Sequence, residues 1–290
     1  MPYLTVAKEN SGNIDLYYED HGAGKPVILI HGWPLSGRAW EKQVPALIHA
    51  GHRVVVYDRR GFGNSGKPVS GYDYNTLAKD LHTLITKLNL RDVTLVGFSM
   101  GGGEVARYLG KYGSSRVKKA VFIAAIPPFL LKTQDNPQGL DASVFDGIKI
   151  SIVADRPAFL TQFLKNFYSA DALRGKFISD EVIQLSWNIA ATASPTGTLT
   201  CVTSWLEDFR SDLKRIKIPT LVIHGDDDRI LPLAATGQRV PEFVKHAQLF
   251  VVKGGPHGLT WTHAEAVNRH LLEFLEGSAR KKGISRAQAV

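Results

Sequence analysis

The sequence predicts an α/β fold, a mostly parallel, doubly wound sheet covered by helices on both faces. Two observations predict it: short apolar runs rich in β-branched residues, and amphipathic segments that alternate with them. Such alternation is typical of βαβ units, whose parallel strands are buried on both faces. The expected strands lie at residues 26–30, 53–57, 93–96, 120–126, 220–223 and 249–252.

The amphipathic segments between these runs have the periodicity of helices that bury one face. We expect such helices near residues 40–50, 75–89, 101–112 and 263–276. Ahead of the first buried run, residues 4–8 and 14–19 alternate between apolar and polar side chains. This alternation favours an antiparallel hairpin that precedes the parallel strands.

The alternation stops between residues 127 and 213, where no buried strand is evident. Apolar side chains recur there at spacings that suit short amphipathic helices: Phe159, Phe163, Phe167, Ile178, Val182 and Trp187. We therefore expect a helical insertion that covers one end of the sheet as a lid. The prediction is one domain over residues 1–290, with a sheet core (1–126 and 214–277), a helical lid (127–213) and a basic tail (278–290).

The composition argues against several classes of partner. The formal charge of +8 comes from 35 Lys and Arg against 27 Asp and Glu, and a basic tail contributes part of it. No basic face interleaved with aromatic residues is evident, so we predict no nucleic-acid partner. The N-terminus lacks an apolar signal region and no apolar stretch approaches 18 residues, so we expect no membrane span and a cytoplasmic protein.

The sequence also contains no pattern typical of a metal or disulfide site. Its single cysteine, Cys201, has no second cysteine to pair with, and no Cys/His spacing suits zinc. We therefore predict neither a metal nor another cofactor.

A glycine-rich stretch, GFSMGGG at residues 97–103, surrounds one serine. It follows the run VTLV and precedes a helical pattern, which is the context in which G-x-S-x-G forms a nucleophile elbow. Glycines at 97 and 101 let strand and helix approach closely, and the helix N-terminus adds backbone N–H groups beside the serine. Ser99 is therefore the candidate nucleophile.

A serine nucleophile needs a base and an acid, which on such a scaffold follow it in the order Ser, acid, His. The loop after the run ending at Ile126 offers no carboxylate, whereas the next strand runs into HGDDDRILP at 224–232. Asp226 suits a turn-stabilising role beside Gly225. We prefer Asp228 as the acid, with Asp227 as the alternative.

The base is expected in the glycine-rich loop after the last strand. His257 lies there in KGGPHG, whereas His263 and His270 fall on the following amphipathic helix and are interpreted as surface or structural residues. A loop histidine suits a proton carrier. We therefore predict a Ser99–His257–Asp228 triad.

Two backbone N–H groups are expected to form an oxyanion hole. One belongs to Met100, directly after the nucleophile, and the other to Trp33 in the loop HGWPL at 31–35, since Pro34 has no N–H. The predicted substrate pocket comprises Trp33, Pro34, Phe98, Ile126, Ile230 and Leu231, closed on the acyl side by lid residues such as Phe129 or Phe163.

A third glycine-rich stretch, YDRRGFGNSGKP at 57–68, contains two adjacent arginines. We interpret it as a structural loop rather than an anion site, with Asp58 pairing with a nearby arginine and the glycines supplying turns.

Five stretches together carry a family resemblance: HGWPLSGRAW at 31, YDRRGFGNSGKP at 57, VGFSMGGGE at 96, HGDDDRILP at 224 and GGPHGL at 254. In this order and at these intervals, the chain resembles the α/β-hydrolase family and, within it, the cofactor-free haloperoxidases and related aryl esterases (perhydrolases). The resemblance covers about residues 3–277. It implies the same triad, with Asp228 as the acid, and the same two oxyanion donors.

The resemblance further implies a small ester or carboxylic acid as substrate and hydrogen peroxide as a possible second nucleophile. Members active in perhydrolysis resemble this sequence in having a proline at the position of Pro34, which could aim the Trp33 carbonyl at peroxide. A lactonase or carbon–carbon bond hydrolase with the same triad stays open, as does a non-catalytic receptor on this fold. The oligomeric state, a homo-oligomer included, is also open.

Overall fold

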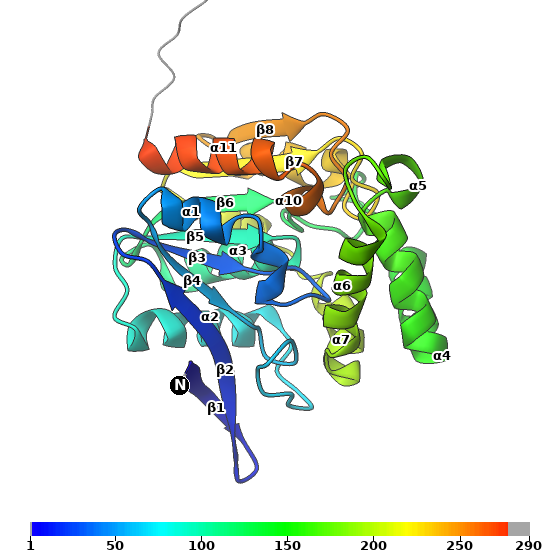
Figure 1. Cartoon of the computed structure of the whole chain (residues 1–290), viewed down its shortest axis with the longest axis horizontal. Helices are drawn as coiled ribbons and strands as arrows, with labels where there is room; N and C mark the ends of the chain where they lie inside the picture. Colours follow the sequence, from blue (N-terminus) through cyan, green and yellow to red (C-terminus); the bar gives the residue numbers. More distant parts are fainter. Residues whose placement is uncertain (1, 278–290) are drawn as a thin grey trace, which may run out of the picture.

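The fold is an eight-stranded sheet with helices on both faces, seen in a computed structural model that describes residues 2–277 (Figure 1). The strands, in chain order, are β1 (Tyr3–Glu9), β2 (Gly12–His21), β3 (Pro26–Ile30), β4 (Arg53–Tyr57), β5 (Val93–Phe98), β6 (Val117–Ile123), β7 (Thr220–Gly225) and β8 (Gln248–Val252). Their order in the sheet is β1-β2-β4-β3-β5-β6-β7-β8. The predicted α/β class is confirmed; the predicted basic tail lies outside the described residues.

The predicted antiparallel hairpin forms the start of this sheet. β1 and β2 pair antiparallel, and β2 pairs antiparallel with β4. Every later pairing, from β4 through to β8, is parallel. The carboxyl ends of six strands therefore meet at one edge of the sheet, which is where ligands bind in open α/β folds.

Helices form a layer on each face. One layer contains α1 (Val44–His49) and α11 (Ala264–Glu276), which contact each other, and the other contains α2 (Tyr74–Lys87) and α3 (Met100–Tyr112). The remaining short elements are η1 (Gly37–Trp40), η2 (Leu233–Ala235), η3 (Gly237–Arg239), α9 (Val240–Phe243) and α10 (Leu259–Thr262). The apolar side chains of the strands pack between the two layers, and β5 and β7 are buried throughout.

Two predicted boundaries are wrong. The run expected as a strand over 120–126 ends at Ile123; Ala124 adopts a positive φ of 41° and leaves the sheet. The residues after it are buried all the same, at 2% or less exposure up to Ile126, so their apolar character reflects burial and not strand structure. The helix expected near 40–50 is divided into η1 and α1, because Pro45 suits the first turn of a new helix.

The predicted helical insertion lies between β6 and β7. Its helices are α4 (Ala142–Phe167), α5 (Ala170–Leu173), α6 (Asp180–Ala191), α7 (Pro195–Ser204) and α8 (Arg210–Leu213). Figure 1 shows α4, α6 and α7 standing at one end of the sheet. The division of the chain into core, lid and tail with the boundaries given above stays a prediction.

Helix α4 is broken near its middle. Asp155 has non-helical angles (φ −158°, ψ 89°), and Pro157 follows it. Proline lacks the N–H that would continue the helix, and the Asp155 carboxylate accepts a hydrogen bond from the Ala158 N–H (3.0 Å), which caps the second half. The break separates an outer half with exposed Ile150 and Val153 from an inner half that runs to Phe167.

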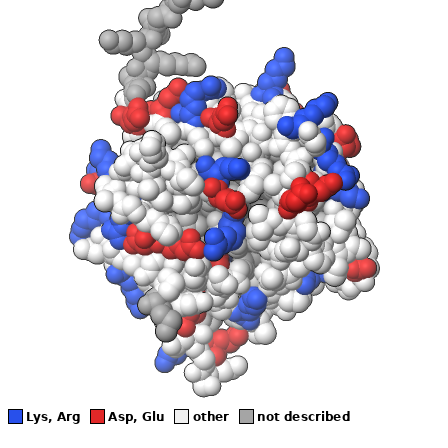
Figure 2. Space-filling model, in the orientation of Figure 1, with Lys and Arg blue, Asp and Glu red and all other residues white. Residues whose placement is uncertain are grey.

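Charge is mixed on the surface. On the face drawn in Figure 2, Lys and Arg side chains are interspersed with Asp and Glu. Within residues 2–277, no helix is long and apolar enough to cross a membrane.

Candidate active site

Ser99 lies at the turn between β5 and α3. Its backbone angles are φ 54° and ψ −118°, a region that costs free energy for a residue with a side chain. The turn is tight: a Cβ at Gly97 would lie 2.5 Å from the Gly101 carbonyl oxygen, and one at Gly101 would collide with the carbonyl of Ile30. The two glycines therefore allow a sharp turn that presents the Ser99 hydroxyl at the carboxyl edge of the sheet.

Ser99, His257 and Asp228 form one continuous hydrogen-bonded chain. His257 Nε2 lies 2.9 Å from Ser99 Oγ, and His257 Nδ1 lies 2.8 Å from Asp228 Oδ2. His257 has no exposed surface, and Ser99 is 6% exposed. This arrangement orients an imidazole so that it can accept the serine proton.

Asp228 is held as a carboxylate. Burial alone would raise its pKa, but the charge on His257 and hydrogen bonds from His224 and His257 outweigh burial, so the pKa lies well below its usual range. Its other oxygen, Oδ1, accepts the N–H groups of Ile230 (2.9 Å) and Leu231 (2.7 Å). These bonds fix the carboxylate plane opposite His257.

The two neighbouring aspartates have other partners. Asp226 accepts the N–H of Gly254 at 2.6 Å, a turn-stabilising contact of the kind predicted for it. Asp227 accepts a hydrogen bond from Ser169 at the end of the lid helix (2.8 Å) and lies 3.6 Å from the Arg229 guanidinium. Asp228 is the aspartate of this loop that the structure brings to His257.

The loop after β3 passes directly against the serine. A Cβ at Gly32 would lie 2.9 Å from Ser99 Cβ, so this loop runs next to the serine, and α3 begins at Met100, the residue that follows it. His31 anchors this loop: its Nε2 accepts the Arg59 N–H (2.9 Å) and its Nδ1 donates to the Gly32 carbonyl (2.8 Å). Burial, with the Arg59 charge, holds the pKa of His31 well below its usual range.

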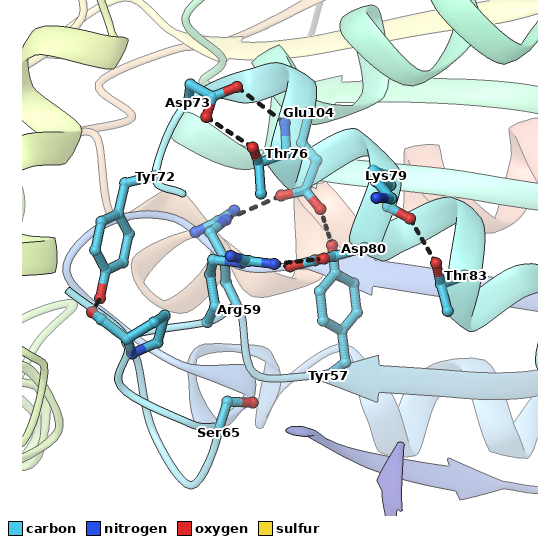
Figure 3. Close-up of polar contacts among 12 residues, drawn as sticks. Tyr57, Arg59, Ser65, Tyr72, Asp73, Thr76, Lys79, Asp80, Thr83 and Glu104 are labelled. Atoms are coloured by element: carbon cyan, nitrogen blue, oxygen red, sulfur yellow. Dashed lines mark hydrogen bonds and ion pairs between the residues drawn. The ribbon is translucent and has the colours of Figure 1, made fainter. Parts of the chain in front are cut away.

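A buried ionic network lies beneath this loop. The Arg59 guanidinium donates to Glu104 Oε2 and to the His31 carbonyl, both at 2.9 Å, and the Tyr57 hydroxyl donates to the other Glu104 oxygen (Figure 3). Arg59 and Glu104 are each about 1% exposed at their side chains. The network therefore ties the loop after β3 to the helix that follows the serine.

The structural interpretation of the adjacent arginines fits this burial, but the partner predicted for Asp58 is wrong. Arg60 pairs with Asp80 of α2 (2.6 and 2.7 Å), and Arg59 pairs with Glu104. The Asp58 carboxylate instead accepts backbone N–H groups of Gly37 (2.7 Å) and Asn64 (2.8 Å). The arginines reach carboxylates on two helices, which the local sequence does not indicate.

Most of the predicted pocket residues are buried around the serine loops. Trp33, Phe98, Ile126 and Leu231 are each exposed by 5% or less, Pro34 is buried and Ile230 is half-buried. The Trp33 indole donates to the Thr198 carbonyl of α7 (3.1 Å), and the Trp33–Pro34 peptide bond is cis.

Lid side chains close over Trp33. Its ring meets those of Phe163 and Trp205 edge-on, with centroids 5.1 and 4.8 Å apart. Of the two lid phenylalanines expected at the pocket, Phe163 thus packs on Trp33, whereas the Phe129 ring lies under the guanidinium of Arg210.

Sequence reasoning missed two residues that touch the Ser99–His257–Asp228 chain. Phe167, noticed only for its helical spacing, packs edge-on against His257, with centroids 4.9 Å apart. His224, visible in HGDDDRILP, lies with Nε2 3.2 Å from Asp228 Oδ2. His263, by contrast, stacks on Phe177, and His270 lies 3.1 Å from Glu273, away from the serine.

Comparisons with known proteins identify the family. Residues 25–264 match the α/β hydrolase fold family. A non-heme chloroperoxidase-type protein of Synechocystis sp. is 63% identical over 95% of this chain and all of its own length. A bifunctional esterase/perhydrolase of Acinetobacter calcoaceticus is 35% identical over 95% of this chain and 99% of its own.

Solved structures give the same picture. A bromoperoxidase from Bacillus anthracis superposes with a TM-score of 0.91 at 50% identity, covering 94% of this chain and 99% of its own. The resemblance that the five sequence stretches indicated is confirmed. The chain therefore belongs to the α/β-hydrolase fold family, among its non-heme haloperoxidase and esterase/perhydrolase relatives.

Proposed function

We propose that this protein is a serine hydrolase that cleaves small carboxylic esters through an acyl-enzyme and passes the same acyl group to hydrogen peroxide. The observation that carries the proposal is the buried hydrogen-bonded chain from Asp228 through His257 to Ser99 at a strained turn. The names of the chloroperoxidase-type and esterase/perhydrolase relatives support the choice of chemistry.

In the first half-reaction, Ser99 Oγ attacks the ester carbonyl carbon while His257 Nε2 takes its proton. Asp228 keeps the imidazole oriented and stabilises the imidazolium. The carbonyl oxygen becomes an oxyanion that accepts the N–H groups of Trp33 and Met100. The C–O bond to the alcohol then breaks, the alcohol leaves with the proton from His257, and the acyl group stays on Ser99.

In the second half-reaction, a nucleophile attacks the acyl-enzyme while His257 takes its proton and returns it to Ser99 Oγ. Water gives the carboxylic acid, and hydrogen peroxide gives the peracid. The peracid oxidises bromide or chloride to the hypohalous acid and is itself reduced to the carboxylic acid. Halogenation is thus a consequence of peracid formation, and Pro34 would favour it by aiming the Trp33 carbonyl as an acceptor for peroxide.

The side chains around Ser99 support a short acyl group. Ser99 is only 6% exposed, and the bulky rings of Trp33, Phe98 and Phe167 are almost fully buried near it. Aromatic walls with few polar groups favour small apolar ligands. We therefore expect acetyl and propionyl esters to be turned over faster than long-chain esters.

The experiment that tests the proposal is the partition of one acyl-enzyme. A short aryl ester is supplied with and without hydrogen peroxide, and alcohol, acid and peracid are measured in the same sample. We expect alcohol release to equal the sum of acid and peracid in each sample, and the share of peracid to rise with peroxide. Ester turnover without any peracid would leave a plain esterase, and a protein with no turnover of esters would overturn the proposal.

A companion assay separates peracid chemistry from other routes to halogenation. Bromination is measured with hydrogen peroxide, first with and then without acetate, and with EDTA as a further arm. The proposal expects bromination to need the carboxylic acid, which acylates Ser99 with loss of water where an ester loses its alcohol, and to survive EDTA. Bromination that proceeds without acetate or any ester would count against an acyl-enzyme origin.

A further inference from the structure

We propose that His224 is a positioning residue for Asp228: its imidazole supplies a second N–H to the carboxylate oxygen that holds His257. The inference rests on the proposed function, because it assigns His224 a role in the Ser99–His257–Asp228 chain. It adds a fourth side chain to that chain, one that touches neither Ser99 nor the substrate.

The geometry defines which atom of His224 carries hydrogen. Its Nε2 lies 2.9 Å from the carbonyl oxygen of Leu231 and 3.2 Å from Asp228 Oδ2. A carbonyl oxygen only accepts hydrogen bonds, so Nε2 must be the donor. The hydrogen is donated to the Leu231 carbonyl, and Asp228 Oδ2, also an acceptor, lies close enough to Nε2 to be stabilised by the same N–H.

The other ring nitrogen, Nδ1, has surroundings that offer no acceptor for a hydrogen. Within the described residues, His224 Nδ1 has no hydrogen-bond partner, although it is buried. Gly237 closes that side so tightly that a Cβ there would lie 2.5 Å from Nδ1. A proton on Nδ1 would be a buried donor without an acceptor, which is costly. The site therefore fits a ring whose hydrogen is on Nε2, the nitrogen that faces both the Leu231 carbonyl and Asp228 Oδ2.

His224 also completes a closed arrangement around the carboxylate. Leu231 donates its N–H to Asp228 Oδ1 and accepts the His224 hydrogen at its carbonyl. The position of His224 at the end of β7, within the sheet and with no exposed surface, gives this arrangement a rigid base. The carboxylate thus cannot rotate away from His257 without breaking bonds to both Leu231 and His224.

The electrostatic consequence follows from the sharing of Oδ2. A donor on Oδ2 stabilises the carboxylate and weakens its pull on the His257 Nδ1 hydrogen. Loss of the His224 donor should therefore change the pH dependence of the reaction in which His257 accepts the Ser99 proton. The ionisable groups around Asp228 are these two histidines; Asp226 binds the Gly254 N–H, Asp227 faces Ser169, and Arg229 pairs with Asp171.

The test removes and then restores the donor. His224→Leu keeps an apolar volume without an N–H, and His224→Gln places an amide N–H near the position of Nε2. The readout is the rate at which a fluorophosphonate labels Ser99 as a function of pH, with kcat/KM for a short aryl ester as the second readout. Both rates need His257 unprotonated.

We expect His224→Leu to move the acidic midpoint of both profiles upward by about half to one pH unit, which corresponds to the loss of one hydrogen bond. His224→Gln should return the midpoint toward that of the wild type. A uniform loss of rate at all pH values in both variants, with an unmoved midpoint, would overturn the inference and leave His224 as a packing residue.

A replacement variant and the wild-type labelling result cover the cases in which the first experiment fails. If His224→Leu does not fold, His224→Asn replaces it, because its shorter amide keeps polarity but cannot reach Asp228; the same upward shift is expected. If the wild type labels with the fluorophosphonate but turns over no ester, the proposed function fails, and the labelling profile alone decides on His224. Ester turnover with unshifted profiles refutes only the role of His224.

Discussion

The Phe167 ring packs edge-on against the imidazole of His257, with centroids 4.9 Å apart and planes at 81°. The backbone joins the same two segments, since the Gly258 N–H donates to the Phe167 carbonyl at 2.8 Å. The last residue of helix α4 is therefore part of the wall that holds the candidate base. The lid and the Ser99–His257–Asp228 chain meet through this contact.

Phe167→Leu tests that contact. The smaller side chain leaves space beside the imidazole, so we expect His257 to sample unproductive orientations and kcat for a short aryl ester to fall by roughly tenfold. The free energy of unfolding should fall by about 1 kcal/mol, less than a truncation to alanine would cost. The matched control is Phe145→Leu, because Phe145 is an equally buried phenylalanine in the other half of α4. Equal losses of kcat in the two variants would contradict a specific role for Phe167.

Ser99→Ala tests whether ester hydrolysis and halogenation share one intermediate. Both reactions pass through an acyl group on Ser99 in the proposed mechanism. The variant should therefore lose both activities together, by a factor on the order of 10³ or more. Urea unfolding checks that it stays folded. Bromination that survives in this variant would refute the shared acyl-enzyme.

Pro34→Leu tests the choice between water and peroxide. Leucine restores a backbone N–H and relaxes both its own φ and the restriction on Trp33, so the Trp33 carbonyl should lose its fixed direction. Peroxide would then lose an acceptor worth on the order of 1 kcal/mol, a several-fold effect on rate, whereas water needs only His257. The ratio of peracid to acid from one ester should fall by that factor while hydrolysis persists. A parallel fall of both rates would make Pro34 a turn residue only.

Glu104→Gln tests the ionic network under the loop after β3. The amide keeps a hydrogen-bonding group near Tyr57 but leaves the buried Arg59 charge without its counter-ion. Loss of one partner of a buried ion pair typically costs about 3–5 kcal/mol. We expect the free energy of unfolding in urea to fall by about that amount. Glu207→Gln is the control: Glu207 pairs with Arg107 at 2.8 Å but is 26% exposed, so its loss should cost less than about 1 kcal/mol. Similar costs for the two variants would argue against the network.

Asp73 gives a pH-dependent prediction. It caps α2 by accepting both the N–H (3.0 Å) and the hydroxyl (2.7 Å) of Thr76 (Figure 3). Partial burial opposes ionisation, but these hydrogen bonds prevail and lower its pKa from 3.8. A lowered folded-state pKa contributes stability that is present above the unfolded value and is lost as the pH falls through the folded value.

Asp73→Ala should therefore cost about 1 kcal/mol of unfolding free energy at neutral pH, with the difference from wild type shrinking below about pH 4. Asp73→Asn retains a capping acceptor without the charge, so its stability difference should vary less with pH. Urea unfolding between pH 3 and 7 measures both. A cost for Asp73→Ala that stays constant over this range would contradict a contribution from the charge.

The sequence allowed the fold and the meeting of three side chains to be predicted, because each follows a strand of one parallel sheet. Ser99, Asp228 and His257 come directly after β5, β7 and β8, whose carboxyl ends share an edge. The glycines on either side of Ser99 predicted the tight turn. The sequence pattern was sufficient to predict these contacts because parallel strands bring the residues that follow them to the same edge of the sheet.

Contacts that depend on how helices pack could not be predicted in the same way. The partner of Arg59 is Glu104, 45 residues away on α3, and nothing near Asp58 indicated it. The end of β6 was misplaced because Ala124 to Ile126 are buried outside the sheet. The contact of His224 with Asp228 depends on the path of the loop between them, which residue types do not reveal.

The break in α4 at Asp155 divides this helix into two halves with different contacts. The inner part ends in Phe167 and continues to Ser169, and both residues contact the loops that carry His257 and Asp227. Substitutions there would disturb the catalytic loops as well as the lid. The outer half exposes Ile150 and Val153, so substitutions of these two side chains should leave the catalytic loops undisturbed.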